Sequence, residues 1–161
     1  MMLEEYKLLL EQANQEKKSI ATKIKRLKKK KKGEIDALIH DLHEEAFEEI
    51  DCLKCANCCT TTGPLLTQKD IERIAKYQRM KPGEFVDQFL HIDEDQDYVF
   101  KEMPCVFLGD DKYCSIYDVR PKACREYPHT DRSNQQGILS LTAKNALICP
   151  AVAYILERIK V

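Results

Sequence analysis

Hydrophobic positions in the first 27 residues recur at alternating steps of three and four, interrupted only at Lys17, which is the spacing of a coiled-coil seam. The positions are Leu3, Tyr6, Leu10, Ala13, Ile20, Ile24 and Leu27. A second stripe predicts another helix over residues 35–50. Gly33 follows a lysine-rich turn and separates the two, as glycine does at helix ends. We therefore predict a helical hairpin, or one long broken helix, over residues 1–50.

Beyond residue 60 the pattern predicts shorter elements. Thr67 and Asp70 have the spacing of a capping box and predict a helix over 68–79. Pro82 marks the start of another helix, because proline is favoured in a first helical turn. Aromatic and β-branched residues predict one or two short strands over 98–108. A further strand is expected at 137–141 and a closing helix at 146–159.

These elements define the fold class as mainly α with a small irregular β component. We predict two parts: a charged helical hairpin or coiled-coil segment at 1–50, and a compact cysteine-rich domain at 51–161. A length of 161 residues and a hydrophobic share of 43% suit one modest core.

Charge is balanced over the chain but divided along it. The formal net charge is -1, which excludes a global attraction to polyanions. Residues 17–32 carry only basic charges and residues 33–51 only acidic ones. The two blocks are complementary within one chain or between two copies, so we expect a homo-oligomer or a protein partner through residues 1–50. Nucleic acid is the less favoured partner, because no aromatic residue is interleaved with the lysines for base stacking.

The cellular compartment decides whether cysteines stay reduced or form disulfides. The start of the chain is acidic where a signal peptide is basic. Its apolar runs are too short to cross a membrane. We therefore expect a cytoplasmic protein that does not engage a membrane. Thiols stay reduced in the cytoplasm, where clustered cysteines more often bind metal than form disulfides.

Eight cysteines are the candidate metal ligands. The first four fall within eight residues and the others at long intervals: Cys52, Cys55, Cys58, Cys59, Cys105, Cys114, Cys124 and Cys149. A C-x2-C step lets two sulfurs meet one ion. The side chains of the adjacent Cys58 and Cys59 point in different directions on an extended chain. One of the two therefore serves a second site or is not needed as a ligand. Distant ligands imply that metal binding and folding are coupled.

Two metal centres remain open. The C-x2-C-x2-C run has bacterial ferredoxin spacing, and Cys149 precedes a proline, as the cysteine that closes that motif does. Both features favour an iron–sulfur cluster, with 4Fe–4S ahead. Tetrahedral zinc is the alternative, because four thiolates satisfy it and eight would supply two closed sites. Arg120 and Arg125 are candidates to offset thiolate charge around the metal, although Arg120 could equally pair with Asp118.

The same residues carry a family resemblance. The cysteine run at 52–59 is followed by Pro104-Cys105, by the segment 114–128 and by Cys149-Pro150, and together they resemble the YkgJ-type cysteine-cluster family. That family is described as a zinc- or iron-chelating domain with eight cysteines, and its members are often named as containing an iron–sulfur cluster. Asn57 stands where relatives have glycine. Flagellin lysine N-methylases share the cysteine pattern within a longer protein.

Three functions compete at this stage. The first is a metal-binding protein that holds an iron–sulfur cluster or zinc through eight cysteines. The second is an iron–sulfur-dependent modifying enzyme, implied by the resemblance to flagellin lysine N-methylases. The third is an interaction protein with purely structural zinc. The enzyme has no independent catalytic motif, since no nucleophile with a nearby base is evident.

Overall fold

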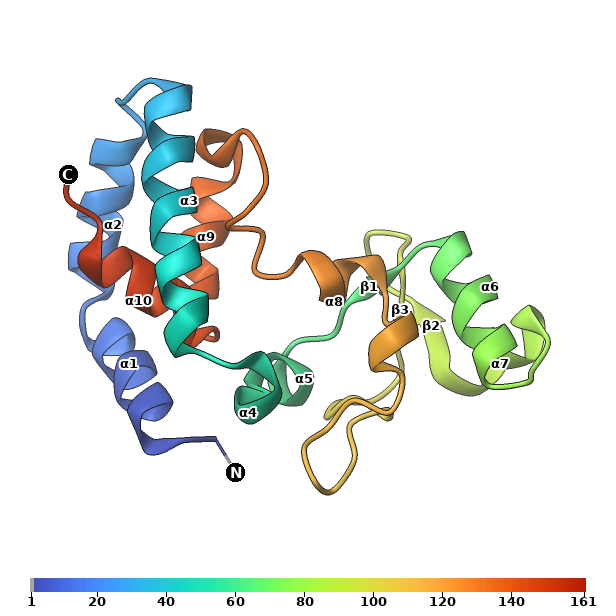
Figure 1. The fold of residues 1–161 in the computed structure, drawn as a ribbon. Coiled ribbons are helices and arrows are strands. Elements are labelled where there is room, and N and C mark those ends of the chain that lie inside the picture. Colours follow the sequence, from blue (N-terminus) through green and yellow to red (C-terminus); the bar gives the residue numbers. More distant parts are fainter. Residues whose placement is uncertain (1) are drawn as a thin grey trace. The chain divides into compact units, whose positions relative to one another are not determined.

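The computed structural model describes residues 2–161, which form two compact units (Figure 1). Unit 1 contains the chain up to Cys55 together with Pro128–Val161, and unit 2 contains Ala56–Tyr127. The fold is mainly α with a small three-stranded antiparallel sheet, which confirms the predicted fold class. The closing segment of the chain thus shares a unit with the N-terminal helices.

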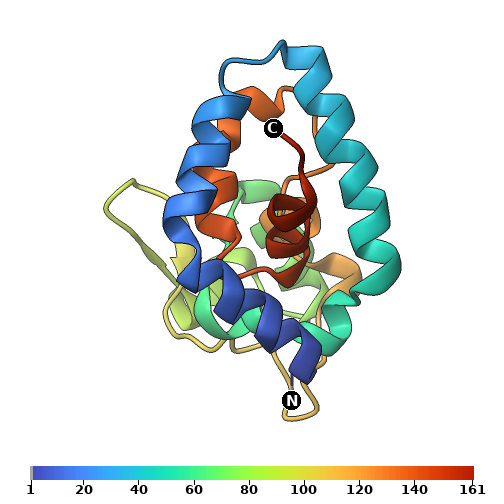
Figure 2. The same cartoon turned by 90° about the vertical axis from the view of Figure 1, so that its left-hand side faces the viewer.

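Unit 1 is a set of helices arranged around α10 (Figure 2). Its helices are α1 (Glu4–Gln15), α2 (Lys17–Leu27), α3 (Lys32–Glu49), α4 (Cys52–Cys55), α9 (Leu139–Asn145) and α10 (Pro150–Arg158). Helix α10 contacts both α1 and α3, and α2 contacts α9. Residues 150–156 of α10 are all buried. This helix is therefore the core of unit 1.

The predicted hydrophobic seam is buried inside unit 1. Every member of the seam is buried except Leu3, which is 40% exposed. The helix breaks between α1 and α2 at Glu16, whose backbone leaves the helical region. A second break falls at residues 28–31, so that Gly33 lies in the first turn of α3. The seam thus packs against α9 and α10 of the same chain, and its use as a coiled coil stays a prediction.

Part of the basic run stabilises the end of α10. The Lys23 ammonium donates to the carbonyl oxygens of Leu156 at 2.6 Å and Glu157 at 2.9 Å. Both carbonyls lie in the last turn of α10, where the helix macrodipole is negative and favours a cation. This lysine therefore serves the fold of unit 1.

The described residues, 2–161, include helices of very different length and polarity. No single helix among them is long and apolar enough to span a bilayer, and only the pair 135–145 and 150–158, bent by 115°, meets the length and composition together.

Unit 2 combines short helices with the sheet. Its elements are α5 (Asn57–Thr61), β1 (Leu65–Leu66), α6 (Gln68–Tyr77), α7 (Pro82–Phe89), β2 (Leu90–Ile92), β3 (Tyr98–Phe100) and α8 (Lys122–Glu126). The strand order is β1-β3-β2, and Val99 pairs with Leu65 on one side and His91 on the other. Phe107 stacks against Phe85 in the core of this unit.

Several predicted elements are confirmed, and others are wrong. The capping box of α6 and the proline start of α7 are present as predicted. The strand predicted over 98–108 ends at Phe100, so Cys105 lies in a loop. The strand predicted at 137–141 is wrong: a 3-10 turn, Gln135–Ile138, leads into α9 there. The closing helix begins at Pro150 and not at 146.

Long-range hydrogen bonds account for the helical start at 135. The Asp36 carboxylate on α3 accepts from the backbone N–H groups of Asn134 at 2.9 Å and Gln135 at 2.8 Å. These bonds lower the pKa of Asp36 and satisfy N–H groups that a helix start leaves without internal partners. Asp36 lies far from residues 134 and 135 in the sequence, so a local pattern could not reveal its role.

We predict that Lys23→Met lowers the free energy of unfolding by about 1 kcal/mol, because the last carbonyls of α10 lose a cationic donor. Chemical denaturation at neutral pH measures the change. Lys29→Met, at an exposed lysine of the same run, is the matched control and should change stability by less than about 0.5 kcal/mol. Equal effects of the two substitutions would contradict a specific role for Lys23.

Candidate metal centre

All eight cysteines are present as thiols, and they divide between the two units. The four-cysteine group, as we name it, lies entirely within unit 2: Cys59, Cys105, Cys114 and Cys124. The three-cysteine group lies entirely within unit 1: Cys52, Cys55 and Cys149. Each group joins residues that are far apart in the sequence. Cys58 follows Asn57 on α5, and its thiol donates to Cys59.

Backbone contacts hold three members of the four-cysteine group. The N–H of Cys105 donates to the carbonyl of Cys59 at 2.8 Å, which joins the loop after β3 to α5. Cys114 forms an antiparallel bridge with Leu108 across the turn that follows Cys105. The side chain of Phe107 lies in the core between them. Core packing therefore fixes the backbone of this loop.

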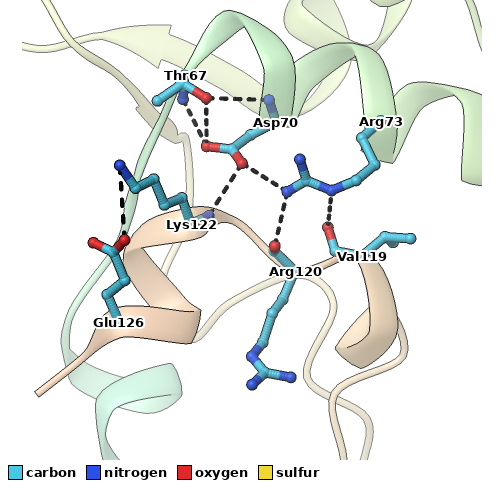
Figure 3. A network of polar contacts seen from close by, with 7 residues as sticks. All are labelled: Thr67, Asp70, Arg73, Val119, Arg120, Lys122 and Glu126. Atoms are coloured by element: carbon cyan, nitrogen blue, oxygen red, sulfur yellow. Dashed lines mark hydrogen bonds and ion pairs between the residues drawn. The ribbon is translucent and has the colours of Figure 1, made fainter. Parts of the chain in front are cut away.

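A buried carboxylate positions the fourth member. Asp70 on α6 is 1% exposed. One of its oxygens accepts from the Thr67 N–H at 2.9 Å and the Thr67 hydroxyl at 2.8 Å. The other accepts from the Arg73 guanidinium at 2.6 Å and from the Lys122 N–H at 3.1 Å (Figure 3). Lys122 begins α8, which carries Cys124, so Asp70 ties that helix to α6.

Arg73 extends the same network to the segment before α8. Its guanidinium donates to the carbonyl oxygens of Val119 at 3.3 Å and Arg120 at 2.9 Å (Figure 3). That segment leads from Cys114 to Cys124. The pair of Asp70 and Arg73 thus holds the chain between two of the cysteines in one conformation.

The thiols of the four-cysteine group are close enough to influence one another's ionisation. Burial, together with negative charge on Cys59, Cys105 and Cys114, raises the pKa of Cys124 to about 12. Burial also raises the pKa of Cys105 and of Cys114, and charge on Cys59 adds to both effects. Four sulfurs from four segments therefore share one electrostatic environment.

Cys59 differs from the other three. A hydrogen bond from the Cys58 thiol lowers the pKa of Cys59 to about 7. Near neutral pH this thiol is therefore the first of the group to carry charge. A thiolate is the form that binds a metal.

The Arg120 guanidinium supplies positive charge to this group. It lowers the pKa of both Cys114 and Cys124. It is held by a 2.9 Å hydrogen bond to the Tyr117 carbonyl and by stacking on the Tyr117 ring, 3.9 Å from the ring centroid. Arg125 is exposed on α8, and none of the contacts described for residues 2–161 joins its guanidinium to a cysteine. Its role stays a prediction.

The thiols are gathered but not yet arranged as ligands. Within residues 2–161, no three or more His, Cys, Asp or Glu side chains form a set that could hold a metal ion as they stand. The donor set itself fits a metal, since all members are sulfur and four thiolates satisfy zinc or an iron–sulfur cluster. Metal binding would therefore require the thiols to turn toward one point and to lose their protons.

The sequence predicted that the cysteines act together as metal ligands, but it did not reveal the residues that hold their segments in place. The capping box at Thr67 was visible in the sequence, yet not the second role of Asp70 as the acceptor for α8. Arg73 gave no signal of its role beyond Asp70, because its other partners are backbone carbonyls 46 and 47 residues away. Contacts of this kind depend on tertiary structure alone.

Comparison with known proteins gives one match. The family model CxxCxxCC, described as "Putative zinc- or iron-chelating domain", matches residues 51–150. Searches of curated proteins and of solved structures found no match.

We predict that Asp70→Asn lowers the free energy of unfolding by about 2–4 kcal/mol at neutral pH, since it replaces one acceptor oxygen and breaks an ion pair whose carboxylate is buried. Burial raises the pKa of the native carboxyl, but hydrogen bonds from Thr67, Arg73 and Lys122 outweigh burial and leave it below the ordinary value. The stability difference from the native protein should therefore be complete above about pH 5 and should disappear as the pH falls through this lowered pKa.

Denaturant unfolding at several pH values measures this dependence. Asp110→Asn, at an exposed turn residue, is the matched control and should be nearly neutral. A stability difference for Asp70→Asn that persists unchanged at pH 2 would contradict the assignment of the effect to the carboxylate charge.

Proposed function

The chain belongs to the CxxCxxCC family of zinc- or iron-chelating domains, and on this premise we propose that its four-cysteine group is the ligand set of one metal centre in unit 2. The observation that carries the proposal is the gathering of four thiols from α5, from two positions in the loop after β3, and from α8. The packing of a hydrophobic core does not require four neighbouring thiols, whereas a four-coordinate metal centre requires four ligands.

Charge supports this assignment. Four thiolates around one divalent ion leave a net charge near -2, which is costly in a partly buried place. Arg120 offsets part of that charge, and its stacking on Tyr117 and its hydrogen bond to the Tyr117 carbonyl keep it in place. Each thiol releases its proton when it binds the metal, so metal affinity should increase with pH.

The centre that we propose is a zinc ion or an iron–sulfur cluster, both of which accept four thiolates. Ferredoxin spacing in the 52–58 run favoured the cluster, but that run is divided here: Cys52 and Cys55 belong to unit 1 and Cys58 to unit 2. The four-cysteine group contains no C-x2-C pair. The ferredoxin spacing therefore gives 4Fe–4S no advantage over zinc in this group.

The wider role that we propose is that of a metal-binding module rather than an enzyme. Tight positioning of the cysteines by the Asp70 network and by the core suits a centre that orders the fold of unit 2. The modifying enzyme related to flagellin lysine N-methylases rests on resemblance only. A protein partner or a second copy bound through residues 1–50 remains a prediction.

We predict that Cys124→Ser abolishes the metal of unit 2, because a closed four-thiolate centre loses a ligand. Protein purified without oxygen would be analysed for zinc, iron and acid-labile sulfide. The native chain should hold zinc, or iron with sulfide, and the variant should lose that amount and unfold with lower cooperativity.

Glu126→Gln, on the exposed side of the same helix, is the control and should keep the full metal content. Glu126→Gln that binds as little metal as Cys124→Ser would indicate a general loss of structure. Cys124→Ser with an unchanged metal content would refute the proposed ligand set.

A further inference from the structure

The outer face of α2 presents a row of positive charge. Lys18 and Lys25 are seven residues apart, which places them on one side of the helix and about 10.5 Å apart along its axis. Lys29 continues the row in the turn that follows α2. All three residues are exposed, and none of them belongs to an ion pair within residues 2–161. We name these three lysines the basic face.

The outer face of α3 has the opposite charge at the same spacing. Asp41 and Glu48 are also seven residues apart, and Glu44 lies between them on the same side of the helix. All three are exposed, and no ion pair in the described part of the chain includes any of them. We name these three residues the acidic face. Because the spacings are equal, two lysines of one helix can meet two carboxylates of the other when the helices lie side by side.

The two faces point away from each other in one chain. Helix α10 lies between α2 and α3: Lys23 of α2 donates to its last carbonyls, and Glu45 of α3 accepts from Tyr154 at 2.6 Å. Figure 2 shows α2 in blue and α3 in cyan on opposite sides of the red α10. The apolar faces of both helices are buried, so their charged faces point outward. Across residues 2–161, the basic and acidic blocks share only the local ion pair of Lys30 and Glu34.

We propose that the basic face of α2 docks onto the acidic face of α3 in a second copy of this chain. Charge and spacing both match, and neither face is neutralised within its own chain. Such a contact joins two different faces and is therefore heterologous. Because the faces lie on opposite sides of unit 1, every docked copy leaves one face of each kind open. Association therefore continues from copy to copy, independently of the metal centre proposed for unit 2.

The composition of the basic face favours a protein partner over a membrane or a nucleic acid. The exposed residues between Lys18 and Lys25 are small: Ser19, Ala21 and Thr22. A helix that lies in a bilayer surface presents large apolar side chains. Proteins that bind single-stranded nucleic acid stack bases on aromatic side chains. The net charge of -1 also gives no overall attraction to a polyanion.

Salt concentration should control this association, since exposed ion pairs are individually weak and screened by salt. Static light scattering of the whole reduced chain, at up to about 1 mM protein, reaches millimolar dissociation constants. At an ionic strength of about 10 mM the average mass should rise with concentration beyond that of two chains. At about 1 M, where the Debye length is about 3 Å, it should equal that of one chain. A chain that is monomeric under both conditions would overturn the proposal.

Charge reversal separates this contact from a general effect of net charge. Lys18→Glu/Lys25→Glu should abolish association at low ionic strength. Lys69→Glu/Lys76→Glu is the matched control, because these exposed lysines have the same spacing on α6 of unit 2 and change the net charge equally. The control should associate as the native chain does. Equal loss in both variants would assign the effect to net charge and refute the docking faces.

A rescue experiment tests whether the two faces meet. Adding Asp41→Lys and Glu48→Lys to Lys18→Glu/Lys25→Glu exchanges the sign of both faces and restores the native net charge. Association at low ionic strength should return. Circular dichroism identifies folded variants, and a folded fourfold variant that stays monomeric would show that these faces do not meet.

Mixing tests the head-to-tail geometry. Lys18→Gln/Lys25→Gln removes two cations of the basic face, and Asp41→Asn/Glu48→Gln removes two charges of the acidic face, so each variant alone should be monomeric. An equimolar mixture keeps one complete contact and should stop at two chains per complex. Larger complexes in the mixture, or none, would contradict this geometry. A native chain that stays monomeric but binds a short DNA duplex or phosphatidylserine vesicles through Lys18 and Lys25 would overturn the second copy as partner.

Discussion

The buried carboxylate of Asp70 is the constraint on which unit 2 depends. It accepts from the N–H of Thr67, the N-cap residue of α6. It also pairs with Arg73 and accepts from the first N–H of α8. A buried charge is tolerated only when hydrogen bonds satisfy it, and here four donors do so. Because these donors come from three places in the chain, the carboxylate fixes the approach of α8, and with it Cys124, to the rest of the unit.

Thiol chemistry explains why such rigidity matters. Burial alone makes a cysteine a weak acid, and neighbouring thiolates make it weaker still. A thiol in such surroundings, as Cys124 is, stays protonated unless a cation compensates the charge. Arg120 and water compensate only part of the negative charge that these four thiols would carry when ionised. A bound metal cation compensates the rest. Cys59, whose pKa is lowered to about 7, is the natural first ligand.

Much of this organisation could be predicted from the sequence, and the rest depends on contacts that no local pattern contains. The periodicity of Tyr6, Leu10 and Ile24 gave the buried stripe correctly, because helix amphipathicity reflects burial whichever partner covers it. It could not show that α9 and α10 are the partners. The segment at 137–141 misled, because a short apolar run fits a strand or a helix equally and a distant carboxylate decided the outcome. Clustering at 52–59 did not show which cysteines share a site, and the structure divides them between two units. The allocation of each thiol is set by tertiary structure.

We propose above all that four cysteine sulfurs of unit 2 form the coordination shell of one metal centre. X-ray absorption at the zinc or iron edge of the metal-loaded Cys52→Ser chain tests it most directly, because that substitution leaves the four-cysteine group intact. We expect a first shell of sulfur only, with four sulfurs at about 2.3 Å if the metal is zinc. A shell made up of nitrogen or oxygen atoms would contradict it.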